Sequence, residues 1–173
     1  LAAREYSSVE DILKTAEERN ETPFIIICDE IEDPHNLGAI IRTAECCGVH
    51  GIIIPKRRSA SLNPTVAKTS AGALEYMKVA RVTNIANTID LLKSKGVWVF
   101  GADMDGEDFK RTDYTVPCAI VIGNEGKGIG ALTAKKCDKI ISLPMRGQIN
   151  SLNASVAAGL LMYEVFRNRN QCG

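Results

Sequence analysis

The 173-residue sequence has no apolar run that approaches the roughly 20 residues needed to cross a membrane. Its N-terminus also lacks the basic stretch followed by an apolar stretch that marks an export signal. These two absences predict a cytoplasmic protein. The first residue is Leu1 rather than Met, so we expect the natural protein to continue upstream.

The cysteines form no CxxC pair, and no histidine lies beside them at the spacing of a zinc site. The six are Cys28, Cys46, Cys47, Cys118, Cys137 and Cys172. Six cysteines would suit disulfides in a small secreted protein. However, Cys28 and Cys118 lie in apolar runs, which favours free, buried thiols in a reducing compartment. We therefore expect no disulfide framework and no metal site.

The chain also lacks net charge, because 21 Lys and Arg residues balance 21 Asp and Glu residues. The overall basic excess that favours binding to nucleic-acid phosphates is therefore missing. Basic residues do cluster locally, at Lys56, Arg57 and Arg58, at Lys68, at Lys135 and Lys136, and at Arg146. Each cluster fits either solvated surface charge or a phosphate-binding surface, so charge alone does not decide.

Short apolar runs alternate with helical patterns from Pro23 onward. The expected strands are 24–28, 51–54, 76–82, 97–101, 119–123 and 140–143, and the expected helices are 36–47, 63–72, 84–95 and 152–167. This alternation predicts an α/β fold with a mostly parallel sheet and helices on both faces. Residues 23–173 are expected to form one domain, and residues 1–22 a linker or short helix.

Ligands of such sheets bind at the carboxyl ends of the strands, where three segments stand out. The first, DPHNLGAIIR at 33–42, follows the strand expected at 24–28. We expect Asn36 to cap the next helix, and Gly38 to let a backbone or ligand approach closely. Arg42 lies at the margin of the apolar helix face, as either a salt-bridged structural residue or a phosphate and substrate clamp.

The second segment, VIGNEGKGIG at 121–130, follows the strand expected at 119–123. Its glycines can bring backbone N–H and C=O groups against a ligand, although a plain flexible loop is the alternative. The spacing matches neither the dinucleotide-binding GxGxxG nor the P-loop. The carboxylate of Glu125 would repel a pyrophosphate and suits a cationic or hydroxyl-rich ligand better.

The third segment, LPMRGQINSLNAS at 143–155, leads from the last expected strand into the last helix. Asn150 or Ser151 is the expected N-cap. Asn153 and Ser155 follow, although capping needs only one such residue. This surplus of small polar side chains predicts that the segment binds a ligand.

Together, DPHNLGAIIRTA, IGNEGKG and LPMxGxxNSLNASVA resemble the three motifs of the SpoU (TrmH-like) branch of the SPOUT RNA methyltransferases. The likeness runs from about residue 23 to residue 167 in the family's order and spacing. Each motif is weak alone, but the combination is highly specific. Within the branch, the sequence is most similar to bacterial 23S ribosomal RNA guanosine-2′-O-methyltransferases. Ala154 departs from the valine that close relatives often have.

The resemblance implies a C-terminal trefoil knot, which general connection rules would not suggest. It also implies S-adenosylmethionine as cofactor, a homodimer, an RNA substrate that is 23S rRNA, and an RNA-binding domain upstream. Carried over by motif, the catalytic residues are Asn36, Arg42, Glu125 and Asn153. The cofactor-binding residues are Gly123, Asn124, Glu125, Gly126, Leu143, Met145, Ser151 and Leu152. With an RNA substrate, we expect the RNA-binding residues to be Arg42 and four residues of the local basic clusters, Lys56, Arg57, Arg58 and Arg146.

The implied reaction methylates a ribose 2′-hydroxyl, a weak acid that needs a base or stabilisation of the forming alkoxide. An arginine with a pKa above about 12 is a poor base. We therefore expect Arg42 to stabilise the alkoxide, Asn36 and Asn153 to orient the reacting groups, and Glu125 to fix Arg42 or a ligand hydroxyl.

Three alternatives remain at this point. The first is the same chemistry on transfer RNA, and the second is a non-catalytic RNA-binding or ribosome-assembly module of the same fold. The intact polar set, which includes Asn150, argues against the module. A nicotinamide-dependent oxidoreductase is the third alternative, and it lacks its GxGxxG after the first strand.

Overall fold

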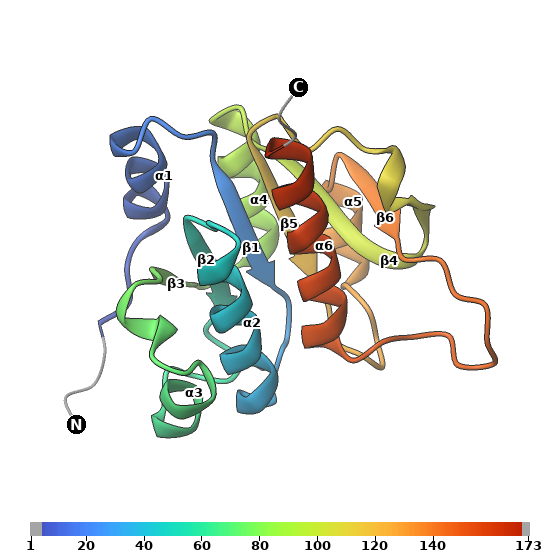
Figure 1. Ribbon diagram of the computed structural model, residues 1–173, viewed down its shortest axis with the longest axis horizontal. Helices are drawn as coiled ribbons and strands as arrows, with labels where there is room; N and C mark the ends of the chain where they lie inside the picture. Colours follow the sequence, from blue (N-terminus) through green and yellow to red (C-terminus); the bar gives the residue numbers. More distant parts are fainter. Residues whose placement is uncertain (1–4, 171–173) are drawn as a thin grey trace.

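Six parallel strands form one sheet in the order β3-β2-β1-β5-β4-β6. The computed structural model describes residues 5–170. The strands are β1 (Phe24–Cys28), β2 (Gly51–Pro55), β3 (Val79–Val82), β4 (Trp98–Asp108), β5 (Cys118–Ile122) and β6 (Lys139–Ser142). Since every pairing between these strands is parallel, the predicted α/β fold is confirmed (Figure 1).

The two central strands are apolar along their whole length because both of their faces are covered. Every residue of β1 and of β5 is buried. Such continuous apolar runs are typical of parallel strands between two layers of helices. The two strands pair from Phe24 opposite Cys118 to Cys28 opposite Ile122. Their carboxyl ends therefore coincide, and the segments that follow them leave the sheet side by side.

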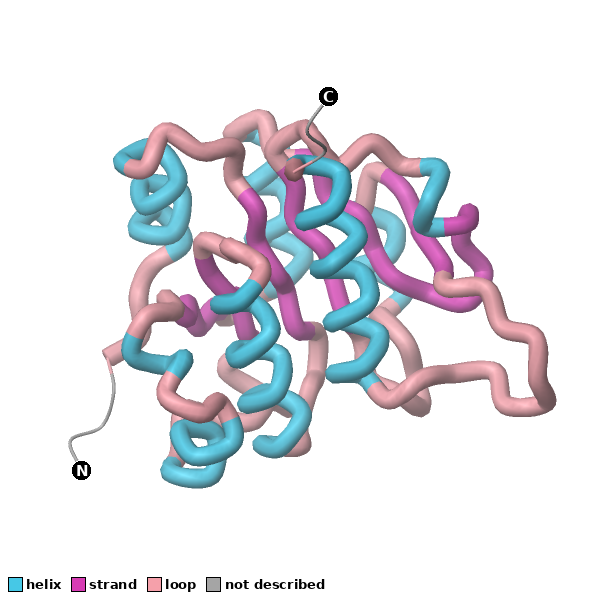
Figure 2. The backbone as a smooth tube through the Cα atoms, viewed as in Figure 1, coloured by secondary structure: helices cyan, strands magenta, loops and turns pink. Residues whose placement is uncertain are grey.

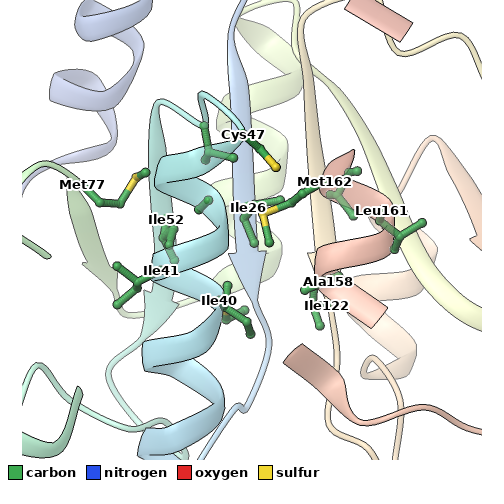
Figure 3. Packing of buried hydrophobic residues seen from close by; sticks show 14 of the residues in the cluster. Ile26, Ile40, Ile41, Cys47, Ile52, Met77, Ile122, Ala158, Leu161 and Met162 are labelled. Carbon is green, nitrogen blue, oxygen red and sulfur yellow. The ribbon is translucent and has the colours of Figure 1, made fainter. Parts of the chain in front are cut away.

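Helices cover both faces of the sheet, as predicted. The helices α2 (Pro34–Cys46), α3 (Pro64–Thr69) and α6 (Ala154–Arg169) pack into one apolar cluster (Figures 1 and 3). The helices α1 (Val9–Glu18), α4 (Ile85–Ser94) and α5 (Ala131–Lys136) pack into a second cluster on the other face. Two short 3-10 helices, Ala73–Glu75 and Phe109–Arg111, complete the described elements (Figure 2).

Several element boundaries differ from the predictions. The strand expected at 76–82 begins only at Val79, because the 3-10 turn Ala73–Glu75 precedes it. The helix expected at 63–72 ends at Thr69. The short helix α5 was not predicted, because its six residues are too few for a clear periodicity. In the N-terminal segment, residues Val9–Glu18 form α1, whose Ile12 and Ala16 are fully buried.

The five cysteines in the described part of the chain are free thiols, as expected. Cys46 is nevertheless exposed, which corrects the expectation that all are buried, while Cys172 lies outside the described residues together with the rest of 171–173. Within residues 5–170, no helix is long and apolar enough to span a membrane.

Gly38 is needed for helix packing, because a Cβ there would lie 1.8 Å from Oγ1 of Thr69 on α3.

Arg169, in the last turn of α6, ties the end of this helix to two other segments. Its guanidinium donates hydrogen bonds to four backbone carbonyl oxygens at 2.7 to 2.9 Å, those of Thr22, Pro23, Tyr114 and Val116. These carbonyls precede β1 and β5, so one side chain joins α6 to the starts of both central strands.

Replacing Arg169 by methionine should lower the free energy of unfolding by about 3 kcal/mol, because four backbone carbonyls, three of them in part-buried hydrogen bonds, would lose a charged donor. Urea unfolding followed by circular dichroism measures this change. Arg167→Met is the matched control: among residues 5–170 Arg167 bonds to Glu164 alone, and its own side chain is 56% exposed, so its ion pair should contribute about 1 kcal/mol at most. Equal losses in the two variants would contradict the structural role of Arg169.

Candidate functional site

The order in which the chain adds strands reverses between β1 and β5. Open α/β sheets bind ligands at such a switch point. From β1 the chain builds β2 and β3 outward on one side, and it then crosses to build β4, β5 and β6 on the other. The backbone N–H of Asp29 donates to the carbonyl of Ile122 at 2.8 Å. This bond holds the first and second sequence segments next to each other where they leave the sheet.

A cavity of about 490 Å³ opens at the carboxyl ends of β4, β5 and β6, under the start of α6. All eight residues predicted to bind the cofactor line it: Gly123, Asn124, Glu125, Gly126, Leu143, Met145, Ser151 and Leu152. The loop between β6 and α6, which supplies the last four of these, projects from the body of the molecule (Figure 1). The structure therefore brings the second and third segments together around one space.

The glycine loop after β5 is folded back on itself by hydrogen bonds within the loop. The side-chain Oδ1 of Asn124 accepts hydrogen bonds from the N–H groups of Gly126 and Lys127, at 2.8 and 3.3 Å. The backbone carbonyl of Asn124 accepts from Gly128 at 2.7 Å. A Cβ at Gly123 would lie 2.4 Å from the carbonyl carbon of Gly128. Only glycine at position 123 allows this closure.

The turn after β1 holds this loop at two points. The buried carboxylate of Asp29 accepts a hydrogen bond from the N–H of Gly130 at 3.2 Å. Burial raises the pKa of Asp29, and the Gly130 hydrogen bond partly offsets that rise. The amide of Asn124 donates to the carbonyl of Glu30 at 3.4 Å. Both ends of the loop are thus anchored to the end of β1.

Glu125 is the centre of a polar cluster that joins all three segments. Its Oε1 accepts hydrogen bonds from the side-chain amides of Asn36 (3.2 Å) and Asn153 (2.9 Å) and from the N–H of Ala154 (3.0 Å). Asn153 also donates to Oδ1 of Asn36 at 3.1 Å. Within residues 5–170 no donor reaches Oε2 of Glu125, so this oxygen is available to a ligand.

Asn36 joins this cluster because it does not cap α2. The prediction that Asn36 is the N-cap is wrong, since Asp33 caps the helix by accepting from the N–H of His35 at 2.8 Å, and Pro34 occupies the first turn. Asp33 is the better placed side chain because proline favours the first helical position directly after the cap. The amide of Asn36 is thereby free for Glu125 and Asn153.

The cap of α6 also differs from the prediction. Asn153, not Asn150 or Ser151, is the N-cap, and its Oδ1 accepts from the N–H groups of Ser155 (2.9 Å) and Val156 (3.2 Å). The Oδ1 atom of Asn153 therefore caps the helix while its amide N–H₂ group contacts Glu125. Asn150 and Ser151 are exposed and line the cavity, which agrees with the expected surplus of polar groups.

A second cavity of about 370 Å³ is also lined by residues of the polar cluster. Its lining residues are Glu30, Ile31, Glu32, Asp33, Asn36, Asn124, Glu125, Asn153 and Ala154. Three of these, Asn124, Glu125 and Ala154, also line the first cavity. The two cavities therefore share a wall, and Glu125 belongs to it.

Arg42 lies on α2 with an exposed side chain. No hydrogen bond or ion pair reaches it from any residue in the range 5–170. Glu125 therefore does not hold Arg42 within the described residues: its Oε1 accepts from two amides and the N-terminus of α6 instead. The other half of the expectation, that Glu125 fixes a ligand hydroxyl, stays a prediction for Oε2. The exposed position also argues against a salt-bridged structural role, and it leaves the guanidinium available to a substrate.

The basic residues expected to bind RNA are all exposed and lie at three places: Arg42 on α2, the turn after β2 and the loop after β6. Lys56, Arg57 and Arg58 form the turn after β2, where Arg58 pairs with Glu30 of the second cavity at 3.4 Å. Arg146 lies in the loop after β6. Lys136, in contrast, is paired with Asp90 at 2.9 Å, as expected of ordinary surface charge.

Residues 23–163 match the family model of the SpoU rRNA methylases. The chain belongs to this SpoU methylase family. The predicted family is thereby confirmed, and the three motifs that indicated it are the ones that meet around the two cavities.

Relatives of this SpoU-family chain agree with the assignment. YacO of Bacillus subtilis, assigned to the TrmH family of tRNA/rRNA methyltransferases, is 58% identical over 174 residues, or 100% of this chain and 70% of YacO. The crystal structure of the SpoU methyltransferase AviRb from Streptomyces viridochromogenes, in complex with S-adenosylmethionine, superposes with a TM-score of 0.81 and 30% identity. It aligns with 87% of this chain and 59% of its own length.

A solved RNA 2′-O ribose methyltransferase is also similar, with a TM-score of 0.77 and 25% identity over 96% of this chain and 60% of its own. The SpoU-family chain thus spans about three fifths of these two solved proteins. Since a SpoU methyltransferase binds S-adenosylmethionine in its crystal structure, this molecule is the expected cofactor of the family member described here.

Sequence reasoning missed one wall of the first cavity. Ala102, Asp103 and Met104 line it from β4, beyond the strand expected at 97–101. Their position was the available signal, because they directly follow that strand and ligands bind at the carboxyl ends of parallel strands. They carry neither the glycines nor the run of small polar residues that mark the second and third segments.

Proposed function

We propose that this chain is the methyltransferase part of an enzyme that transfers a methyl group from S-adenosylmethionine to a ribose 2′-hydroxyl of RNA, with a guanosine of 23S rRNA as the target. One observation carries the proposal: the two cavities share a wall made of Asn124, Glu125 and Ala154. A cofactor in one cavity and a nucleotide in the other would be held against opposite sides of the same polar cluster.

The first cavity fits the cofactor. Its volume of about 490 Å³ lies within the range of small-molecule sites. Leu143, Leu152 and Leu161 give it an apolar part suited to adenine. Glu125 supplies a carboxylate in the same wall, which favours a positively charged group. When bound, S-adenosylmethionine supplies an electrophilic methyl group on a cationic sulfur.

The second cavity fits the sugar of a nucleotide better than its phosphates. Glu30, Glu32 and Asp33 line it, and carboxylates accept hydrogen bonds from hydroxyls but repel phosphate. Cationic side chains lie at its margin instead, where Arg58 contacts Glu30. Phosphate groups on either side of the target nucleotide would meet Arg58 and its exposed neighbours Lys56 and Arg57, which is the usual way of positioning RNA.

The residues of this site have separate roles in the proposed reaction. Asn36 and Asn153 hold the Glu125 carboxylate in one place, because both donate to the same oxygen. Arg42 lines neither cavity, and its exposed guanidinium is assigned by motif to stabilise the negative charge that develops on the ribose oxygen as it attacks, since a guanidinium stays charged at neutral pH. The 2′-hydroxyl proton leaves through another group or water.

We also propose that the chain retains the family's trefoil knot and that it is a dimer. The position of α6 supports the knot. The strand before it, β6, is the edge strand of the sheet, yet the chain returns from there so that α6 packs on α2 and on the central strand β5. Supporting the dimer, α6 carries an outward apolar row of Val156, Leu160, Tyr163 and Phe166, each 40% to 53% exposed. Rows of this kind mark protein interfaces.

Replacing Leu160 by aspartate should convert the dimer into a monomer, because the charge would lie within the apolar row. Sedimentation equilibrium should give about twice the 18.8 kDa chain mass for the unsubstituted protein and a single chain mass for the variant. Leu132→Asp is the matched control, since Leu132 is 59% exposed but belongs to α5 on the other face. A monomeric unsubstituted chain, or a dimeric Leu160→Asp variant, would refute this interface.

The RNA target is tested by offering separated substrates. The protein is incubated with methyl-labelled S-adenosylmethionine and, in parallel, with unmodified 23S rRNA, 16S rRNA or transfer RNA. We expect label to enter 23S rRNA alone. Label in transfer RNA would replace the rRNA assignment by its tRNA alternative, and no label in any RNA despite cofactor binding would favour a non-catalytic module.

A further inference from the structure

Asp103 places a carboxylate of β4 in the wall of the first cavity. The residue lies where β4 loses its register with β6, between Ala102 and Glu107. The N–H of Met104 donates to Oδ1 of Asp103 at 2.7 Å, which fixes the orientation of the carboxylate. Within the described residues no donor reaches Oδ2. One acceptor is therefore oriented and left for a ligand.

Gly128 keeps this acceptor accessible. A Cβ at position 128 would lie 3.2 Å from Oδ2 of Asp103, and the φ of +67° there is one that side chains rarely adopt. Glycine thus leaves open the space beside the carboxylate, on the loop whose closure also depends on Gly123. The bulge of β4 and the glycine loop of β5 meet at this point of the cavity wall.

We infer that Asp103 binds the cofactor by accepting hydrogen bonds from the 2′- and 3′-hydroxyls of its adenosine ribose. This inference rests on the proposed function, because it takes the first cavity as the S-adenosylmethionine site. The apolar residues of that cavity suit adenine, and Glu125 suits the charged sulfur end. The ribose hydroxyls are the neutral donors that remain, and a carboxylate is the acceptor that ribose commonly meets in nucleotide sites.

Calorimetric binding to the unsubstituted protein, Asp103→Ala and Asp105→Ala tests the inference. Asp105 is an exposed carboxylate two residues further along the same bulge. Because Asp105 does not line the cavity, it is the matched control for charge. Two probes are used: S-adenosylhomocysteine, which carries both the ribose diol and the amino-acid group, and 5′-methylthioadenosine, which carries only the diol. Asp103→Ala should weaken both by at least about tenfold, and Asp105→Ala should weaken neither.

The two probes separate the possible outcomes. A loss for S-adenosylhomocysteine alone would assign Asp103 to the ammonium group and overturn the diol assignment, and no loss for either probe would overturn the inference altogether. If the unsubstituted protein binds neither probe nor S-adenosylmethionine, the proposed function fails, which is a different result from the failure of Asp103. Thermal unfolding checks that Asp103→Ala is folded, and Asp103→Asn, which keeps the volume but not the charge, replaces it if it is not.

Discussion

Replacing Arg42 by alanine should lower the rate of methyl transfer to RNA by at least about a hundredfold, the usual cost of removing a group that stabilises developing negative charge. The affinity for S-adenosylmethionine should stay within about twofold, because Arg42 does not line the cofactor cavity. Stability should not change either, since the side chain is exposed and no described residue bonds to it. Single-turnover kinetics and calorimetry measure the two quantities separately.

Two further variants sharpen the result for Arg42. Arg42→Lys keeps the charge but not the planar fork, so part of the activity should remain if the role is electrostatic. Arg19→Ala removes another exposed arginine, at the end of α1 on the opposite face of the sheet, and should leave the rate unchanged. Retained turnover in Arg42→Ala, or a loss of cofactor binding in that variant, would contradict the assigned role.

Replacing Gly126 by leucine should weaken S-adenosylmethionine binding by about a hundredfold, equivalent to about 2.7 kcal/mol. A Cβ at this position meets only Oδ1 of Asn124, at an ordinary contact distance of 3.5 Å, so the fold accommodates a side chain. Because Gly126 lines the cavity, the rest of the leucine occupies space that the cofactor needs. Calorimetry measures the affinity, and thermal unfolding confirms that the variant is folded.

Gly147→Leu is the control for this prediction. Gly147 lies in the exposed loop after β6, has nothing within 4 Å of a built Cβ, and does not line the cavity. Its substitution adds the same side chain to the surface and should leave cofactor affinity unchanged. Unchanged affinity in Gly126→Leu would mean that the first cavity does not hold the cofactor.

The sequence predicted well the features that depend on long or repeated signals. The apolar run 24–28 coincides with β1, because a strand buried on both faces leaves no position for a polar residue. The eight cofactor-side residues meet at one cavity because the ends of adjacent parallel strands lie at one edge of the sheet. The catalytic assignments themselves stay predictions until the variants above are measured.

The features that the sequence did not predict depend on choices among similar residues or on tertiary contacts. Asp33 and Asn36 are equally good caps by residue type, and only the helix start decides between them. Asp103 was missed because the bulge in β4 results from pairing with β6, which no local pattern records. Arg169 looks like any surface arginine until the starts of β1 and β5 surround it.

The central claim, methylation of a ribose oxygen, is tested most directly by identifying the methylated nucleoside. The protein is incubated with unmodified 23S rRNA and S-adenosylmethionine carrying a trideuterated methyl group, and the RNA is digested to nucleosides for mass spectrometry. We predict labelled 2′-O-methylguanosine, formed at least about a hundredfold more slowly when Arg42→Ala replaces the unsubstituted protein. Label on a guanine base, with none on ribose, would contradict the proposed reaction.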